Sequence, residues 1–475
     1  MLSYEEYADQ DALGLAKLIR DGEVSAAEVV DAALARADAV EPQINALVAR
    51  RDDVAREQAA APSGKGSFAG VPFVFKDLGC WQEGWPAEAG SNLWKGFVAP
   101  KDFTHTSRVK ETGAIPIART STSEFGISIS TETEACGPTR NPWNLERSAG
   151  GSSGGTAAAV AAGIVPMGHG SDGGGSIRIP AANCGLFGLK PSRGRNPFGP
   201  FVGEGWAGLA CQHVLSRSVR DSAAMLDATQ GAEPGDPYAS PPPTRPYLQE
   251  VGEDPGRLRV AYHVTGLGGL PLDPVNKAAV LDAVDLLQAL GHEVEEAHPE
   301  VDTEVLGPAM IAVVAPNQKL ALDARYAQLG RPPEDGDVEA VTRAFAERAA
   351  DLTAADYAAA VQAFHQLGRR FGAFFERYDV LVSSTLAQPP AEIGEIRTDC
   401  GTADGFLEDV WQRMPVTQYF NMTGCPAMSV PLYWSPRGLP IGVHVGAGFG
   451  REDVLFRLAA QLEETRPWFH RRPSL

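Results

Sequence analysis

Apolar residues recur along this chain in two patterns, one typical of helices and one typical of strands. Behind Ser25 and Glu28, which form a capping box, Val29–Val40 carries apolar residues at helical spacing and predicts a helix of about four turns. The run Gly70–Phe75 is continuously apolar and of strand length, and it ends at Lys76. By the same criteria, later strands are predicted at 114–119, 258–264, 292–297, 380–384 and 440–447, and helices at 106–111, 274–290, 353–379 and 451–464.

Strands and helices that alternate in this order predict an α/β layer architecture. The chain has 475 residues, of which 44% are hydrophobic and 21% are charged, so it is long enough for a large buried core. The proline-rich stretch 239–246 is the best linker candidate. Strand and helix signals resume on both sides of it without a shift in composition, so we interpret it as a surface loop within one domain spanning 1–475.

Charge and cysteine usage narrow the class of protein. The formal net charge is −19 with no block of like charges, which makes nucleic acid and anionic membranes poor partners. The six cysteines are scattered and form no C-x-x-C pair, which fits the reduced thiols of a cytoplasmic enzyme. The start of the chain lacks the basic and apolar regions of a signal peptide, and the apolar run 156–167 is too short to span a bilayer. We therefore expect a cytoplasmic protein.

Two serine-bearing glycine runs, RSAGGSSGG at 147–155 and GHGSDGGGSIRIPA at 168–181, are the most distinctive features of the sequence. The segment GHGSDG formally fits a dinucleotide fingerprint, but no acidic residue occurs between Gly173 and Gly203, where the ribose ligand would be expected. A phosphate-binding P-loop would need a lysine, and none occurs between Lys110 and Lys190. Nucleotide binding is thus a weak hypothesis.

The segment GGSSG at 150–154 also fits G-x-S-x-G, which would make Ser152 the nucleophile of an α/β-hydrolase elbow. That elbow follows a strand, whereas 139–149 is predicted to be a loop. His365 or His444 could complete such a triad, but nothing around either residue singles it out. Both glycine runs could also be plain turns in which the serines are only turn formers.

Lys76, at the end of GVPFVFKD (70–77), changes this picture when it is combined with the two glycine runs. Together with GPTRNPWNLERSAGGSSGG (137–155), GSDGGGSIRIPAANCGLFGLKPSRGR (170–195), NMTGCPAMSVPL (421–432) and GLPIGVHV (438–445), it makes the chain resemble the amidase signature family. The resemblance covers about residues 25–464. Within the family, the opening third and the C-terminal stretch look most like the 6-aminohexanoate cyclic dimer hydrolase group.

This resemblance implies a Ser-cisSer-Lys triad, with Ser176 as nucleophile, Ser152 as bridging serine after a cis peptide, and Lys76 as base. Ser153 is then a non-catalytic neighbour. The implied fold is a single large α/β domain with a mixed, mostly parallel central β-sheet covered by helices on both faces. No cofactor or metal is implied, and homodimers are frequent in the family. One departure, STSEFG at 121–126, stands where the family commonly has Asn and then Pro, and it bears on substrate contacts rather than on the triad.

The residue types suit amide hydrolysis. A lysine accepts a proton only when neutral, and burial beside an apolar strand lowers its pKa from about 10.4 toward 7. The competing interpretation is that Lys76 merely pairs with Asp77. Bare backbone N–H groups at Gly173, Gly174 and Gly175 can converge with that of Ser176 into an oxyanion hole, and Gly126 is expected to line the same site.

Several residues near the glycine runs are expected to have a structural role. Asp172 and Arg178 match family positions where such residues brace the nucleophile loop. His169 is expected to be packed or hydrogen-bonded, and Cys136 and Cys184 are expected to be small core residues.

We therefore expect an amidase that cleaves linear or cyclic amides through an acyl-enzyme, with ester or carbamate cleavage by the same site. The main alternative is the amidase-like component of a tRNA-dependent amidotransferase, in which the triad releases ammonia from glutamine for a partner protein. A nucleotide-binding protein that uses GHGSDG is the alternative from a different class.

Overall fold

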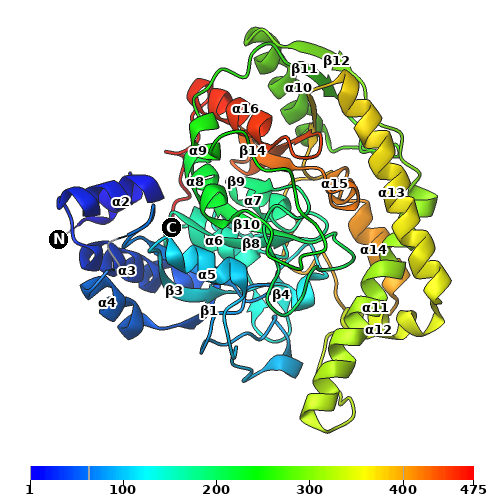
Figure 1. Cartoon of the computed structure of the whole chain (residues 1–475), viewed down its shortest axis with the longest axis horizontal. Coiled ribbons are helices and arrows are strands. Elements are labelled where there is room, and N and C mark those ends of the chain that lie inside the picture. Colours follow the sequence, from blue (N-terminus) through cyan, green and yellow to red (C-terminus); the bar gives the residue numbers. More distant parts are fainter. Residues whose placement is uncertain (1, 63–64, 400) are drawn as a thin grey trace.

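The protein is built around an eleven-stranded β-sheet (Figure 1). This computed structural model describes residues 2–62, 65–399 and 401–475. Its strand order is β1-β3-β2-β8-β10-β9-β14-β15-β13-β11-β12. The bounds are β1 (Leu47–Arg50), β2 (Pro72–Lys76), β3 (Ile115–Thr120), β8 (Met167–Asp172), β9 (Phe187–Lys190), β10 (Cys211–Ser216), β11 (Arg259–Tyr262), β12 (Glu293–Glu296), β13 (Val380–Ser384), β14 (Ala427–Trp434) and β15 (Pro440–Ala447).

The sheet is mixed, as expected. Parallel pairing occurs in two blocks, β3-β2-β8 and β13-β11-β12. The other neighbours pair antiparallel, among them β14 and β15, which a tight turn joins directly. The turn between β14 and β15 is too short for a parallel connection, which needs a crossover. The expectation of a mostly parallel sheet is met within the two parallel blocks and not between them.

Helices cover both faces of this sheet, as expected. Along β15, Val443 and Val445 point into a core shared with α10 and α16, whereas Gly442 lies against α7 and Gly446 against α15. The helix bounds in the first half of the chain are α1 (Tyr4–Ala8), α2 (Ala12–Asp21), α3 (Ala26–Ile44), α4 (Asp52–Ala60), α5 (Thr104–Glu111), α6 (Gly154–Ala161), α7 (Arg178–Cys184) and α8 (Val219–Thr229). Those in the second half are α9 (Tyr247–Glu250), α10 (Pro274–Ala289), α11 (Thr303–Leu329), α12 (Ala340–Arg348), α13 (Ala354–Arg377), α14 (Ala403–Trp411), α15 (Thr417–Thr423) and α16 (Glu452–Thr465).

Every strand and helix predicted from the apolar pattern is present within a few residues. The Ser25 capping box begins α3, as predicted, and the helix runs to Ile44. The stretch 239–246 forms neither helix nor strand. Residues 139–149, predicted to be a loop, instead form a two-stranded ribbon of β6 (Arg140–Asn141) and β7 (Asn144–Ser148) beside another ribbon of β4 (Glu132–Thr133) and β5 (Gly137–Pro138).

The second glycine run contains a sheet strand that the sequence pattern did not indicate. Residues 167–172 form β8, between β2 and β10. Gly168 is needed there because a Cβ at that position would lie 2.5 Å from Val74 of β2 and 2.8 Å from Thr156 of α6. The GHGSD residues thus build a strand and not the loop that a dinucleotide fingerprint requires, which removes the nucleotide-binding alternative.

Helix α11 is the one described helix that is long and apolar enough to cross a membrane by length and composition. More than half of its apolar window is buried inside the molecule, where it packs against α12, α13 and α14. Figure 1 shows α11 and α13 as a layer along one side of the sheet. Its apolar character is that of a core helix.

Candidate active site

Lys76 ends β2, behind a run of buried apolar residues. Phe73, Val74 and Phe75 precede it on the strand, and all four residues are 0% exposed. Lys76 Nζ lies 2.6 Å from Ser152 Oγ and donates to Ser171 Oγ at 2.9 Å. Burial lowers the pKa of this amine to about 7, although Cys80 and Asp172 act in the opposite direction. The amine can therefore exchange a proton near neutral pH.

Asp77 does not pair with Lys76. Its carboxylate lies 3.6 Å from Arg119 Nη2 and accepts hydrogen bonds from the backbone N–H of Glu88. Adjacent residues of a strand point to opposite faces, so Lys76 and Asp77 face different partners. The simple ion-pair interpretation of Lys76 is wrong.

Ser152 lies in the loop between β7 and α6, after a Gly151–Ser152 peptide that is cis. Gly151 fits closely here, because a Cβ at this residue would lie 2.7 Å from the backbone of Ser128 and Ser130. Gly126 approaches from the other side, where a Cβ would lie 3.2 Å from Ser152 Oγ. The N–H of Gly126 donates to a backbone carbonyl, so Gly126 walls the site without being a free donor.

Ser176 lies in the loop that connects β8 to α7, and the residue is nearly buried at 8% exposure. The N–H of Ser153 donates to the carbonyl of Ser176 at 3.3 Å, which ties the two glycine runs together. Gly175 adopts a φ of 150°. In the described part of the chain, no acceptor receives the backbone N–H groups of 173–176. These N–H groups are available to a developing negative charge.

A buried ion pair holds this loop. Asp172 accepts two hydrogen bonds from the guanidinium of Arg178, each of 2.9 Å, and both side chains are 0% exposed. Arg178 also donates to the carbonyl of Thr417 and to the side chain of Asn421, and it contacts His444 Nε2 at 3.1 Å. Although burial opposes ionisation, the charge of Arg178 and its hydrogen bonds hold the pKa of Asp172 well below its usual range. These contacts brace the loop between β8 and α7, because they tie both of its ends to α15.

In the part of the chain that the structure describes, no histidine is hydrogen-bonded to Ser152. His444 is buried against Arg178, and His365 is exposed on α13. His169 is buried and bonded, with Cys80 Sγ and Gln212 Oε1 within 3.1 Å of its two ring nitrogens. The α/β-hydrolase alternative therefore lacks its histidine base at Ser152.

The two cysteines of the glycine-run blocks differ from each other. Cys184 is buried, as expected, but Cys136 is only partly buried because it lies in the turn of the β4-β5 ribbon. Among the described residues, no group of three or more His, Cys, Asp and Glu side chains is placed to hold a metal ion.

Sequence reasoning missed Ser171 and Met414. Ser171 contacts Lys76 because β8 lies beside β2, a pairing that its glycine-rich sequence does not announce. Met414, although distant in sequence, approaches the loop that carries Ser176, since its Cε would lie 3.5 Å from a Cβ on Gly174. Only the spatial arrangement of distant segments reveals either residue.

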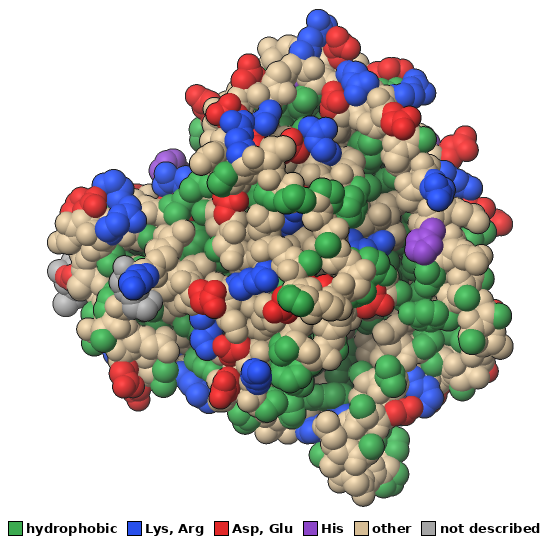
Figure 2. Space-filling model, viewed as in Figure 1, with side chains coloured by type: hydrophobic (Ala, Val, Ile, Leu, Met, Phe, Trp, Pro, Cys, Tyr) green, Lys and Arg blue, Asp and Glu red, His purple; other side chains and the backbone are tan. Residues whose placement is uncertain are grey.

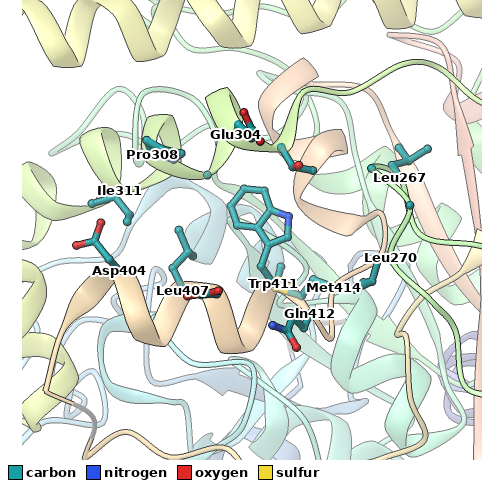
Figure 3. A pocket seen from close by; sticks show the side chains of 15 residues that line it. Leu267, Leu270, Glu304, Pro308, Ile311, Asp404, Leu407, Trp411, Gln412 and Met414 are labelled. Atoms are coloured by element: carbon teal, nitrogen blue, oxygen red, sulfur yellow. The ribbon is translucent and has the colours of Figure 1, made fainter.

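A cavity of about 490 Å³ lies beside the site, between α11, α14 and the loop 267–270 (Figure 3). Trp411 and Leu407 of α14 face Pro308 and Ile311 of α11 across it. Met414 forms part of its wall, so this residue separates the cavity from Gly174. A cavity of small-molecule size thus lies beside the loop that carries Ser176.

Comparison with known proteins agrees with this geometry. Residues 28–456 match the amidase family. The 6-aminohexanoate-cyclic-dimer hydrolase of Paenarthrobacter ureafaciens is 40% identical over 480 residues, which cover 98% of this chain and 97% of that protein. The structure of a 6-aminohexanoate cyclic dimer hydrolase complexed with substrate superposes with a TM-score of 0.94 at 39% identity, covering 98% of both chains.

A glutamyl-tRNA(Gln) amidotransferase structure from Thermotoga maritima is more distant, with a TM-score of 0.76 and 26% identity over 98% of this chain and 95% of that one. The family match and the nearly full-length relatives lead to the same conclusion. This chain belongs to the amidase family and is a hydrolase of amide carbon–nitrogen bonds.

Proposed function

We propose that this amidase forms an acyl-enzyme on Ser176, with Ser152 as proton relay and Lys76 as base. The observation that carries the proposal is the 2.6 Å contact between Lys76 Nζ and Ser152 Oγ in a fully buried setting. A lysine with a pKa of about 7 is neutral in half of the molecules at neutral pH, so it can take a proton there.

The hydroxyl of Ser171 orients that amine. A neutral amine has two N–H donors and one lone pair, and one donor is directed to Ser171 Oγ at 2.9 Å. The lone pair is then available to Ser152, which can pass on a proton received from Ser176. In the acylation step, Ser176 Oγ attacks the amide carbon while its proton moves to Ser152 and the proton of Ser152 moves to Lys76.

The N–H groups of Gly173, Gly174, Gly175 and Ser176 supply the oxyanion hole. The carbonyl oxygen gains negative charge in the tetrahedral intermediate, and each such donor contributes about 3 to 4 kcal/mol to its stabilisation. The relay then returns a proton to the departing amine, and the C–N bond breaks. Water attacks the acyl-enzyme by the same route, which regenerates Ser176. Because the hole does not contact the leaving group, esters and carbamates are further substrates.

The substrate class proposed is a linear or cyclic amide of small-molecule size, similar to the 6-aminohexanoate cyclic dimer after which the Paenarthrobacter relative is named. The amidotransferase alternative predicts that the chain alone is inactive on simple amides and works only with a partner. Hydrolysis of a neutral amide by the purified chain separates the two.

Active-site labelling with a fluorophosphonate, followed by peptide mapping, tests the nucleophile. We expect the label on Ser176, its loss in Ser176→Ala, and strongly slowed labelling in Ser152→Ala and Lys76→Met. Ser153→Ala is the matched control, because Ser153 is adjacent, buried and bonded to Ser171 rather than to Lys76. Label on Ser152 or Ser153, or label that survives Ser176→Ala, would show that the assignment is wrong.

A further inference from the structure

The cavity beside the nucleophile loop has walls suited to an alkyl chain. Its volume of about 490 Å³ is within the range of small-molecule sites. Figure 3 shows the indole of Trp411 directed into the space between α14 and α11, with Leu407 and Ile311 beside it. On the opposite side, Leu267 and Leu270 come from a loop that precedes α10.

The inner wall of the cavity connects it to the proposed chemistry. Met414 lines the cavity, and its Cε also lies near Gly174, two residues before Ser176. Met310 of α11 approaches the same glycine, with its Cε 3.9 Å from a Cβ built there. Methionine side chains are unbranched and adapt their shape easily. A chain attached to an amide at Ser176 reaches the cavity when these two flexible side chains turn aside.

The rim of the cavity is acidic. Glu304 of α11 and Asp404 and Glu408 of α14 belong to the lining, and none of the fifteen lining residues is Lys, Arg or His. Asp404 is already paired with Arg348 at 3.0 Å. Glu304 and Glu408 are exposed. On the face drawn in Figure 2, acidic and basic side chains are interspersed. The cavity thus offers apolar walls and, at its mouth, carboxylates suited to a cation.

We infer that this cavity binds an alkyl arm of the amide substrate that ends in an ammonium group. The arm lies along Trp411 and Leu407, its amide end points toward Met414 and Gly174, and the ammonium reaches Glu304 and Glu408. The inference rests on the proposed function, because it assumes that the scissile amide lies at Ser176.

Matched substrates that differ only at the end of the arm test it. In one series the arm is on the acyl side: 6-aminohexanoyl anilide, hexanoyl anilide and adipic acid monoanilide. In the other it is on the amine side: N-(6-aminohexyl)acetamide, N-hexylacetamide and N-acetyl-6-aminohexanoate. At neutral pH the three members of each series are cationic, neutral and anionic. In one series we expect kcat/KM to be highest for the cationic substrate, lower for the neutral one and lowest for the anionic one. The series that shows this order tells whether the arm lies on the acyl or the amine side of the scissile bond.

The double variant Glu304→Gln/Glu408→Gln removes the two rim carboxylates that form no ion pair with any described residue. We expect it to lower kcat/KM for the cationic substrate about fivefold through KM, with little change for the neutral one. The matched control Glu300→Gln/Asp409→Asn removes two exposed charges near the same helices that do not line the cavity, and it should leave the preference intact. No cationic preference in either series, or a preference that persists in the rim variant, overturns the inference.

Ligand binding to the Ser176→Ala protein separates this inference from the proposed mechanism. With methyl-labelled methionine, n-hexylammonium should shift the NMR signals of Met414 and Met310 more strongly than 1-hexanol does at equal concentration. Loss of a signal in Met414→Leu identifies the Met414 methyl group. The Glu304→Gln/Glu408→Gln variant should abolish the difference between the shifts caused by n-hexylammonium and by 1-hexanol. If the shifts occur but the wild type hydrolyses none of the amides, the cavity assignment stands and the proposed function fails. If the shifts do not distinguish the two ligands, the cavity assignment fails on its own.

Discussion

Lys76 Nζ and Ser152 Oγ are 2.6 Å apart, and neither side chain has appreciable contact with solvent. The lysine comes from the end of a sheet strand and the serine from a loop 76 residues later. Burial makes this contact chemically useful, because the same lysine on the surface would be protonated at neutral pH.

The first prediction concerns the pH dependence of catalysis. Lys76 must be neutral to accept a proton, and its pKa is lowered to about 7. Hence kcat/KM for a neutral amide should fall about tenfold per pH unit below that value and level off above it. Lys76→Arg should be inactive at every pH, because the guanidinium stays charged. A flat profile between about pH 5.5 and 8.5 would contradict Lys76 as the base.

The second prediction concerns the brace of Asp172 and Arg178. Removing either partner leaves an unpaired buried charge, so Asp172→Ala and Arg178→Ala should each lower the free energy of unfolding by about 3 to 5 kcal/mol. The double variant should lose less than the sum of the two. Urea denaturation measures all three, with Asp323→Ala as control, since its ion pair with Lys319 is exposed and should contribute at most about 1 kcal/mol.

The brace also has a pH signature. The pKa of Asp172 is lower in the folded protein than the ordinary value near 3.8. Its contribution to stability should therefore be complete above about pH 4 and should be lost only as pH falls through the lower folded pKa. A contribution that disappears between pH 5 and 7 would be inconsistent with this ion pair.

The third prediction concerns two buried glutamates beside the segment that contains Gly126. Glu124 accepts a hydrogen bond from the backbone N–H of Glu339 at 2.9 Å. Burial, followed by the nearby Glu124 charge, raises the pKa of Glu339 to about 7. Between about pH 4.5 and 7 the folded protein then binds more protons than the unfolded chain, so stability falls as pH rises. Glu339→Gln should raise the free energy of unfolding by about 1 to 3 kcal/mol at pH 8 and change it little at pH 5.

Thermal melts at both pH values measure this effect. Equal stabilisation at pH 5 and pH 8 would mean that the substitution acts through packing rather than through charge.

The fourth prediction concerns the close fit of Gly151. A Cβ there would lie 2.7 Å from the backbone of both Ser128 and Ser130, and backbone cannot move aside cheaply. Gly151→Ala should therefore displace Ser152 and lower amide hydrolysis by at least about 100-fold. Gly372→Ala on α13 is the control, because a Cβ there meets nothing within 4 Å. It should stabilise the helix by about 0.5 to 1 kcal/mol and leave activity unchanged.

Much of the fold could be predicted from the sequence where local signals were strong. The Ser25 capping box and the apolar run 70–75 gave their elements directly, because each is encoded by neighbouring residues. Strand β8 could not be found this way. Its glycines make room for neighbouring side chains from β2 and α6, so the strand lacks the apolar alternation that identifies a strand.

The candidate site also has parts that the sequence predicted and parts that it did not. Lys76, Ser152 and Ser176 lie in short motifs and could be proposed from the sequence, and the structure places the first two in contact. The cavity could not be predicted, because residues such as Ile311 and Trp411 have no common signal until α11 and α14 pack together. Likewise, only tertiary structure directs Asp77 to Arg119 instead of Lys76.

The hydrogen bonds from Arg178 to Thr417 and Asn421 join residues 239 and 243 positions apart. A ribosome releases the chain from the N-terminus onward. The first two hundred residues therefore emerge with the lysine and both serines already synthesised, but without the carbonyl and amide that fix the loop. The loop that carries Ser176 can therefore be fixed in place only after most of the chain has been synthesised.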